Sequence, residues 1–148
     1  MDQIIGKTVS RIFRVLYVFQ GVVEQDDGPL ELRFQDGSVA LFDIATRADC
    51  TVQVTNSAWS DPFAPPLSDE NLEFIRTHGK WTVFDISDTT PASFVIGHQV
   101  SAFREVMSDC RGEQIYKGVV IEFGELAVEV NSWGTDEIEV KWHTSGLA

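Results

Sequence analysis

An internal repeat constrains the fold of this chain more than any other feature of its sequence. Residues 4–15 read IIGKTVSRIFRV, and residues 95–106 read VIGHQVSAFREV. The identical pairs are Ile5/Ile96, Gly6/Gly97, Val9/Val100, Ser10/Ser101 and Val15/Val106. Self-similarity of this kind indicates that one supersecondary unit is used more than once.

The similarity continues downstream in the same order in both halves. The aligned pairs of segments are 30–34 with 119–123, 39–44 with 126–130, and 50–54 with 136–140. A chance alignment rarely keeps one order over four segments. We therefore expect two repeat units, at about 4–54 and 95–142, within a single domain spanning 1–148.

Each unit has the alternation that is typical of strands. Leu30, Leu32 and Phe34 alternate with charged residues, and a period of two indicates a sheet with one buried and one wet face. Asp36-Gly37 predicts a hairpin in the first unit, and Gly124-Glu125 takes the equivalent place in the second. The predicted fold is mainly β, bordering on α+β. It consists of two pseudo-repeated antiparallel β-meanders packed as a barrel or a sandwich.

A different segment, at about 57–90, connects the two units. It begins with a proline-containing loop, and Ser68 then predicts the start of a short helix that Gly79 ends after His78. The stretch 81–86 reads as another strand. Because the segment is too apolar to be a free linker, we expect it to pack across both units.

The charge excludes some classes of partner. The chain has 148 residues with 23 acidic and 11 basic side chains, a net charge of −12. Such a surface repels nucleic acid and anionic membranes, so we expect neither as a partner. It favours a soluble protein, or a protein partner with a basic face. The oligomeric state is left open.

The two cysteines bear on the compartment. Cys50 and Cys110 lie far apart and form no CxxC pair. The first residues lack the basic region of a signal peptide, and the longest apolar run, 15–19, is too short for a membrane span. We therefore expect a cytoplasmic protein with free thiols.

The sequence contains no recognisable catalytic motif. His78, His98 and His143 do not have metal-ligand spacing with each other or with the cysteines. Nucleophile-elbow, phosphate-loop, dinucleotide and HExxH motifs are absent from the sequence. We expect no enzyme, no metal and no cofactor.

Aromatic and acidic residues near strand ends are the candidate contacts for a partner. Exposed aromatics flanked by acids are typical of protein-binding patches. In the alternative interpretation, Trp59 and Trp133 fold over the ends of the sheet and fill the core. The candidate partner-binding residues are Asp49, Trp59, Asp61, Trp133, Asp136 and Glu137.

One pattern resembles a known class of protein. It is IGxxV at 96–100, an alternating strand at 119–123, and an acidic turn before Ile-Glu-Val at 135–140. This resembles small uncharacterised bacterial β-rich proteins, among them immunity proteins of polymorphic toxin systems. The resemblance implies a non-catalytic inhibitor that occludes the basic active site of a cognate toxin, such as a secreted toxin domain. The alternative is a small ligand-binding or enzymatic β domain with a cleft between the two units.

Overall fold

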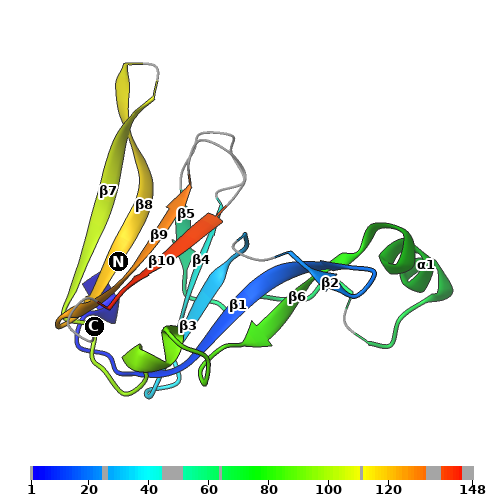
Figure 1. Ribbon diagram of the computed structural model, residues 1–148, viewed down its shortest axis with the longest axis horizontal. Coiled ribbons are helices and arrows are strands. Elements are labelled where there is room, and N and C mark those ends of the chain that lie inside the picture. Colours follow the sequence, from blue (N-terminus) through cyan, green and yellow to red (C-terminus); the bar gives the residue numbers. More distant parts are fainter. Residues whose placement is uncertain are drawn as a thin grey trace.

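The computed structural model describes residues 2–24, 27–44, 52–63, 65–110, 112–132 and 138–144. Within these ranges the chain is mainly β, with two antiparallel sheets and one α-helix (Figure 1). The predicted fold class is confirmed at this level. The barrel alternative is wrong, because in the part of the chain described each sheet remains open at its edges.

The first sheet has the order β2-β1-β3-β4-β5, with β6 added on the other edge of β1. β1 is long enough to pair with β3 through its first half and with β6 through its second half. The strands of this sheet are β1 (Val9–Phe19), β2 (Val22–Val23), β3 (Leu30–Phe34), β4 (Val39–Ile44), β5 (Val52–Thr55) and β6 (Lys80–Asp85).

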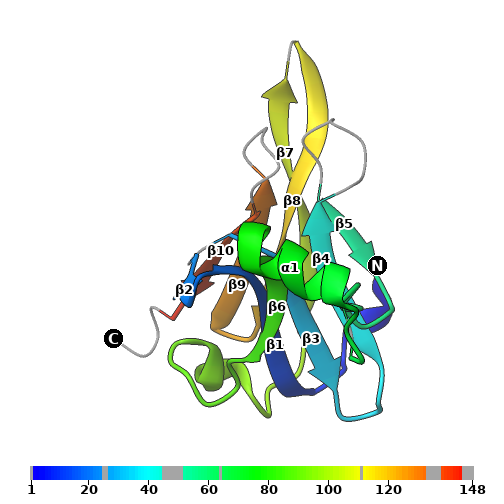
Figure 2. The ribbon, with the colours of Figure 1, turned by 90° about the vertical axis from the view of Figure 1, so that its right-hand side faces the viewer.

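The second sheet is a meander of order β10-β9-β8-β7. The two strands of this sheet that come first in the chain, β7 and β8, form a long hairpin that extends beyond the rest of the molecule (Figure 1, Figure 2). The strands are β7 (Ala102–Cys110), β8 (Glu113–Phe123), β9 (Leu126–Ser132) and β10 (Ile138–His143). Short 3-10 helices, η1 (Asp2–Ile4) and η2 (Ala92–Val95), precede β1 and β7 respectively.

Both predicted hairpins are present. β3 and β4 are joined at Asp36-Gly37, where Gly37 has φ +88° and the Asp36 side chain accepts a 2.9 Å hydrogen bond from the N–H of Ser38. β8 and β9 are joined at Gly124, with φ +71°. Positive φ is the conformation that glycine adopts without steric cost, so local sequence alone specifies these turns.

The two IGxxV segments pair with each other. Gly6 N–H donates to the carbonyl of Val100 at 2.8 Å, and Gly97 N–H donates to the carbonyl of Val9 at 2.9 Å. Val9 N–H likewise donates to His98, and Val100 N–H to Lys7. Each bond from the first segment to the second therefore has an equivalent bond from the second to the first, made by the aligned residues Gly6/Gly97, Lys7/His98 and Val9/Val100.

The connecting segment attaches to the first sheet. The helix α1 (Asp69–His78) begins at Ser68, whose hydroxyl accepts from Asn71 N–H, and ends at Gly79, as the sequence predicts. The predicted strand is also present, as β6. Two elements of the segment attach to the first half: β6 pairs with β1, and α1 lies beyond that pair, at the end of the molecule remote from the second sheet (Figure 1).

One hydrophobic core serves both sheets. Ile12, Leu32 and Phe42 of the first sheet belong to the same buried cluster as Ile121 and Val128 of the second. Ile4 and Val95, from the two short helices, also belong to it. The alternation seen in sequence therefore selects one face of each sheet for this core.

Candidate functional site: a cavity where the two sheets meet

A cavity of about 200 Å³ lies where the segment before β3, the end of β4 and the start of β10 come together. The backbone before β3 forms its floor, two indoles border it, and two carboxylates line it. The lining residues are Asp27, Gly28, Pro29, Asp43, Ile44, Trp59, Trp81 and Ile138.

Hydrogen bonds from β1 hold the floor in place. Val15 N–H donates to the carbonyl of Pro29 at 2.9 Å. The buried Arg14 of β1 donates from Nε to the carbonyl of Gly28 at 3.0 Å and from Nη2 to the carbonyl of Ile138 at 3.3 Å. Arg14 thus ties the floor to both sheets, with a stem that fits among apolar neighbours.

Position 28 in the floor requires glycine, because there is no space for a side chain. A Cβ at this position would lie 1.7 Å from the carbonyl oxygen of Val15 and 3.2 Å from the Trp81 ring. Its φ of +147° also disfavours other residues. The Trp81 ring can therefore lie close to the floor only because residue 28 has no side chain.

Trp81 comes from β6 and crosses toward the cavity on the face opposite the core. It pairs with Tyr17 of β1, and the two rings meet edge-to-face with centroids 5.3 Å apart. Ile12, which belongs to the core, has the opposite parity on β1, so Tyr17, Trp81 and Val83 point away from the core.

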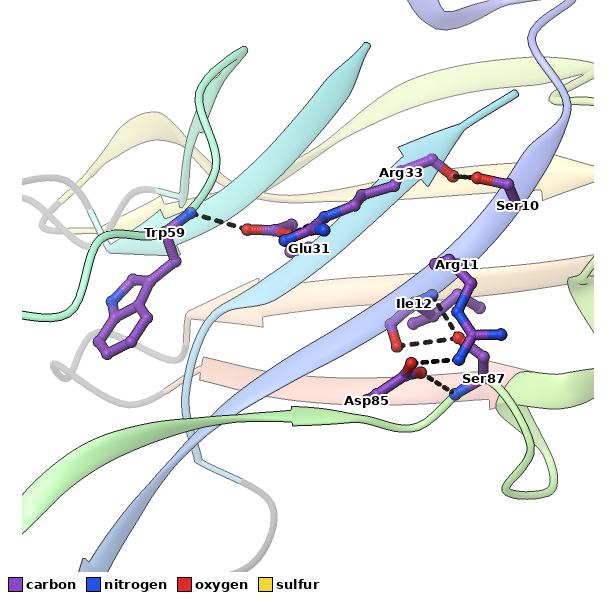
Figure 3. A network of polar contacts seen from close by, with 8 residues as sticks. All are labelled: Ser10, Arg11, Ile12, Glu31, Arg33, Trp59, Asp85 and Ser87. Carbon is purple, nitrogen blue, oxygen red and sulfur yellow. Dashed lines mark hydrogen bonds and ion pairs between the residues drawn. The ribbon is translucent and has the colours of Figure 1, made fainter. Parts of the chain in front are cut away.

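Trp59 is held at the cavity by a buried carboxylate. Glu31 of β3 is only 1% exposed, and its Oε1 accepts from Trp59 N–H at 2.7 Å (Figure 3). Its Oε2 accepts from Arg33 Nε at 2.7 Å, and the Arg33 guanidinium lies 4.1 Å over the Phe13 ring. Glu31 is therefore a positioning residue for the segment that carries Trp59.

The two lining carboxylates each accept one backbone hydrogen bond. Asp27 Oδ1 accepts from Ile138 N–H at 3.0 Å, and Asp43 Oδ1 accepts from Ile44 N–H at 2.7 Å. The ion pairs between described residues involve other carboxylates: those of Glu31, Asp36, Asp61, Glu73, Asp85, Glu122, Glu129 and Glu139. Burial raises the pKa of Asp43, and the bond from Ile44 only partly opposes this shift.

A second group of contacts fixes the end of β6 against β1 (Figure 3). Ser87 is buried; its hydroxyl accepts from Ile12 N–H at 2.9 Å and donates to the carbonyl of Ile12 at 3.3 Å. Asp85 pairs with Arg11 and accepts from Ser87 N–H at 3.0 Å. These contacts set the register that places Trp81 at the cavity.

Several large apolar side chains are exposed on the strands and helix next to Trp81. Trp81 is 39% exposed and Val83 is 42% exposed, both on the solvent face of β6. Other exposed apolar residues occupy the same extension of the first sheet and α1: Phe19, Val22, Leu72 and Phe74. Isolated exposed apolar residues are ordinary, but a group on one extension is typical of a binding surface.

The residues proposed from the sequence have different outcomes. Trp59 is half-buried and lines the cavity, so neither full exposure nor core filling describes it. Asp61 is engaged by Lys80; burial favours a higher pKa, but hydrogen bonds from Lys80 and Phe63 N–H hold its pKa below the ordinary value. The remaining candidates lie outside the described residues: Asp49, Trp133, Asp136 and Glu137.

Sequence reasoning misses four residues that build the cavity: Arg14, Asp27, Asp43 and Trp81. Asp27 reads locally as part of a turn, and Trp81 as an ordinary strand residue. A signal was present for Trp81, because a tryptophan on an alternating strand with Val83 and Asp85 on the same face would be exposed.

The described histidines do not assemble a metal site. Within the ranges covered by the structure, no three His, Cys, Asp or Glu residues are grouped to hold an ion. His143 Nε2 lies 3.1 Å from Glu129 Oε2 on the second sheet, as a partly exposed pair. No helix in this part of the chain has the length and apolar character needed to cross a membrane.

Comparison with protein-family models, with curated proteins and with solved structures gave no significant match. The functional argument therefore rests on the residues and contacts of this chain.

Proposed function

We propose that this protein is a non-catalytic, cytoplasmic binding protein of the immunity type, which neutralises a cognate bacterial toxin by occluding its basic active site. The observation that carries the proposal is the exposed apolar face of Trp81 and Val83, with Trp81 lining the cavity to which Asp27 and Asp43 also belong. This face belongs to a chain with a net charge of −12.

The composition of this face suits a protein partner. Interface centres are enriched in aromatic side chains, and a few such anchors carry most of the binding free energy. Trp81 is braced by Tyr17 and by the floor at Gly28, so little side-chain entropy remains to be lost on binding. The exposed group therefore has the rigidity expected of an anchor.

The charge suits a basic partner. A net charge of −12 on 148 residues sets up a negative potential that steers a positively charged surface toward the protein. Enzymes that act on nucleic acid or nucleotides need positively charged clefts for their substrates. An acidic inhibitor is attracted to such a cleft and competes with the substrate's charge.

The cavity also supports a second candidate, a small ligand-binding or enzymatic domain. Its two carboxylates and two indoles could hold a compact polar ligand, and Ile138 brings the second unit to its wall. We rank this candidate second because about 200 Å³ is below the roughly 300 Å³ at which small-molecule sites usually begin.

We further infer that the two halves are copies of one unit, packed as two layers around the shared core. The reciprocal hydrogen bonds of Gly6 and Gly97 support this inference. So do the bonds from the hydroxyls of Ser10 and Ser101 to the carbonyls of Arg33 and Glu122, both 3.1 Å long. The binding face belongs to the extension of β1, β6 and α1, which the second half lacks.

A matched pair of charge insertions tests the proposed face. Val83→Arg places a positive charge on it, and Met107→Arg places the same charge at a residue that is 46% exposed on the β7–β8 hairpin. We expect an affinity column carrying the wild type or Met107→Arg to retain a basic protein from the native host, and Val83→Arg to lose it. Equal retention by both variants would contradict the proposal for this face.

A further inference from the structure

The cavity has the chemistry of a site for a single cationic side chain. Indole faces attract cations through the ring quadrupole, and tryptophan does so more strongly than the other aromatic residues. Trp59 and Trp81 border the cavity, and Asp27 and Asp43 bring two carboxylates to the same space. The ion pairs between described residues use other carboxylates.

The size of the cavity limits the occupant. About 200 Å³ exceeds the space of a few water molecules, each of which takes roughly 30 Å³, and falls short of a typical small-molecule site. Trp81 lines the cavity and also belongs, with Val83, to the exposed face of β6. One side chain projecting from a partner docked on that face would therefore reach the cavity.

We propose that the cavity receives an arginine side chain of the basic partner, whose guanidinium lies between the two indoles and donates hydrogen bonds to Asp43 and Asp27. Arginine fits better than lysine because its planar group both stacks on aromatic rings and donates in a fixed fork. The identity of the source, a protein partner, rests on the proposed function. The preference for a guanidinium rests on the cavity alone.

The buried Arg14 sets an upper limit on the affinity. Its guanidinium is committed to the carbonyls of Gly28 and Ile138, behind the floor, and its charge opposes a second cation in the cavity. A free guanidinium compound should therefore bind weakly, with a Kd on the order of 1 mM, and a docked partner should supply the remaining affinity through the surrounding face.

The first test uses Nα-acetyl-arginine methylamide with the full chain. The neutral citrulline analogue, which has the same shape, is the control, and the lysine analogue is a third probe. We expect a saturable shift of the Trp59 and Trp81 indole N–H resonances with the arginine compound, and none with citrulline. An equal response to citrulline, a stronger response to lysine, or no response at a probe concentration on the order of 50 mM would overturn the inference.

Neutral variants of the carboxylates complete the test. Asp43→Asn keeps the shape of the side chain and should weaken binding of the arginine compound about tenfold or more, because a charge-assisted hydrogen bond is lost. Asp27→Asn provides an independent second variant. Asp109→Asn removes the same charge from an exposed residue on β7 and should leave binding unchanged. Identical affinity in all three variants would overturn the assignment.

The two proposals fail differently. If the arginine compound does not bind but a basic protein is retained through the Val83 face, the cavity assignment is wrong and the proposed function stands. If the arginine compound binds and no basic protein is retained, the cavity is a guanidinium site in a protein of another function.

Discussion

Glu31 illustrates how a single residue places the candidate site. Its carboxylate is buried on the face of β3 opposite the core, where an unpaired charge would be costly. Arg33 and Trp59 N–H satisfy both oxygens, so folding fixes the segment that carries Trp59. The hydrogen bond from Trp59 N–H to Glu31 therefore both stabilises the fold and positions Trp59 at the candidate site.

Glu31→Gln should therefore destabilise the fold and release Trp59. Loss of the charge weakens two charge-assisted hydrogen bonds, and because Arg33 is partly exposed we expect a moderate cost of about 1–3 kcal/mol in unfolding free energy. Urea unfolding followed by tryptophan fluorescence measures both effects. Glu122→Gln, which breaks the exposed pair with Arg104, is the control and should cost less than about 1 kcal/mol. Equal costs would argue against the special role of Glu31.

Gly97 tests the motif that the two halves share. It has φ +84°, and a Cβ there would meet no atom within 4 Å, so its requirement is conformational and does not come from crowding. Gly97→Val should cost about 1–2 kcal/mol, lowering Tm by about 3 °C or more, and Gly97→Asn should cost less because asparagine tolerates positive φ. Calorimetry of the two variants decides the matter; a shift below one degree for valine would refute the strain argument.

At the scale of elements, β6 is the strand that carries the proposed binding face. It is held by the pairing with β1 and by the contacts of Asp85 and Ser87 at its end. Burial alone would raise the pKa of Asp85, but hydrogen bonds from Ser87 and Arg11 lower the pKa to about 2, below the ordinary value of 3.8.

This depressed pKa predicts a specific acid sensitivity. A carboxyl with a lower pKa in the folded state contributes stability that is fully present above its unfolded value and is lost as pH falls through the folded value. The contribution of Asp85 should thus disappear between about pH 4 and pH 2. Urea midpoints across this range should fall more steeply for the wild type than for Asp85→Asn. Parallel curves would show that Asp85 makes no such contribution.

The elements were largely predictable because their signals are local. The Asp36-Gly37 turn, the Ser68 cap and the Gly79 end of α1 each depend on a few neighbouring residues. The cavity was not predictable in this way. Trp81 meets Gly28 only because β6 adds to the free edge of β1, and no local pattern states which strand edge a segment will join.

At the scale of the whole molecule, the shared core joins two sheets of similar order into one unit. The proposed repeat is inferred from the sequence because strand alternation and the two glycines recur in both halves. The sequence does not show that β6 and α1 attach to the first half, because the apolar residues of the connecting segment can be buried against one half or across both. The asymmetry that results gives only the first half an extension with an exposed apolar face.

The proposed compartment also belongs to this scale. A cytoplasmic protein keeps its thiols reduced, so Cys50 and Cys110 should not be bonded to each other. Cys110 ends β7, whereas Cys50 lies outside the described residues. Mass measurement of the intact protein under non-reducing conditions should give the mass of the free dithiol. A loss of two hydrogens would contradict the cytoplasmic assignment.

The central claim is that an acidic protein is drawn to a basic face on a protein partner, and binding kinetics at low and high salt test it most directly. The partner retained from the native host is immobilised, and its association rate with this protein is measured over a range of ionic strength. Screening shortens the field to about 8 Å at 0.15 M salt, so the association rate should fall steeply as salt rises, while dissociation changes less. A salt-independent association rate, or a partner without a basic face, would contradict the electrostatic account.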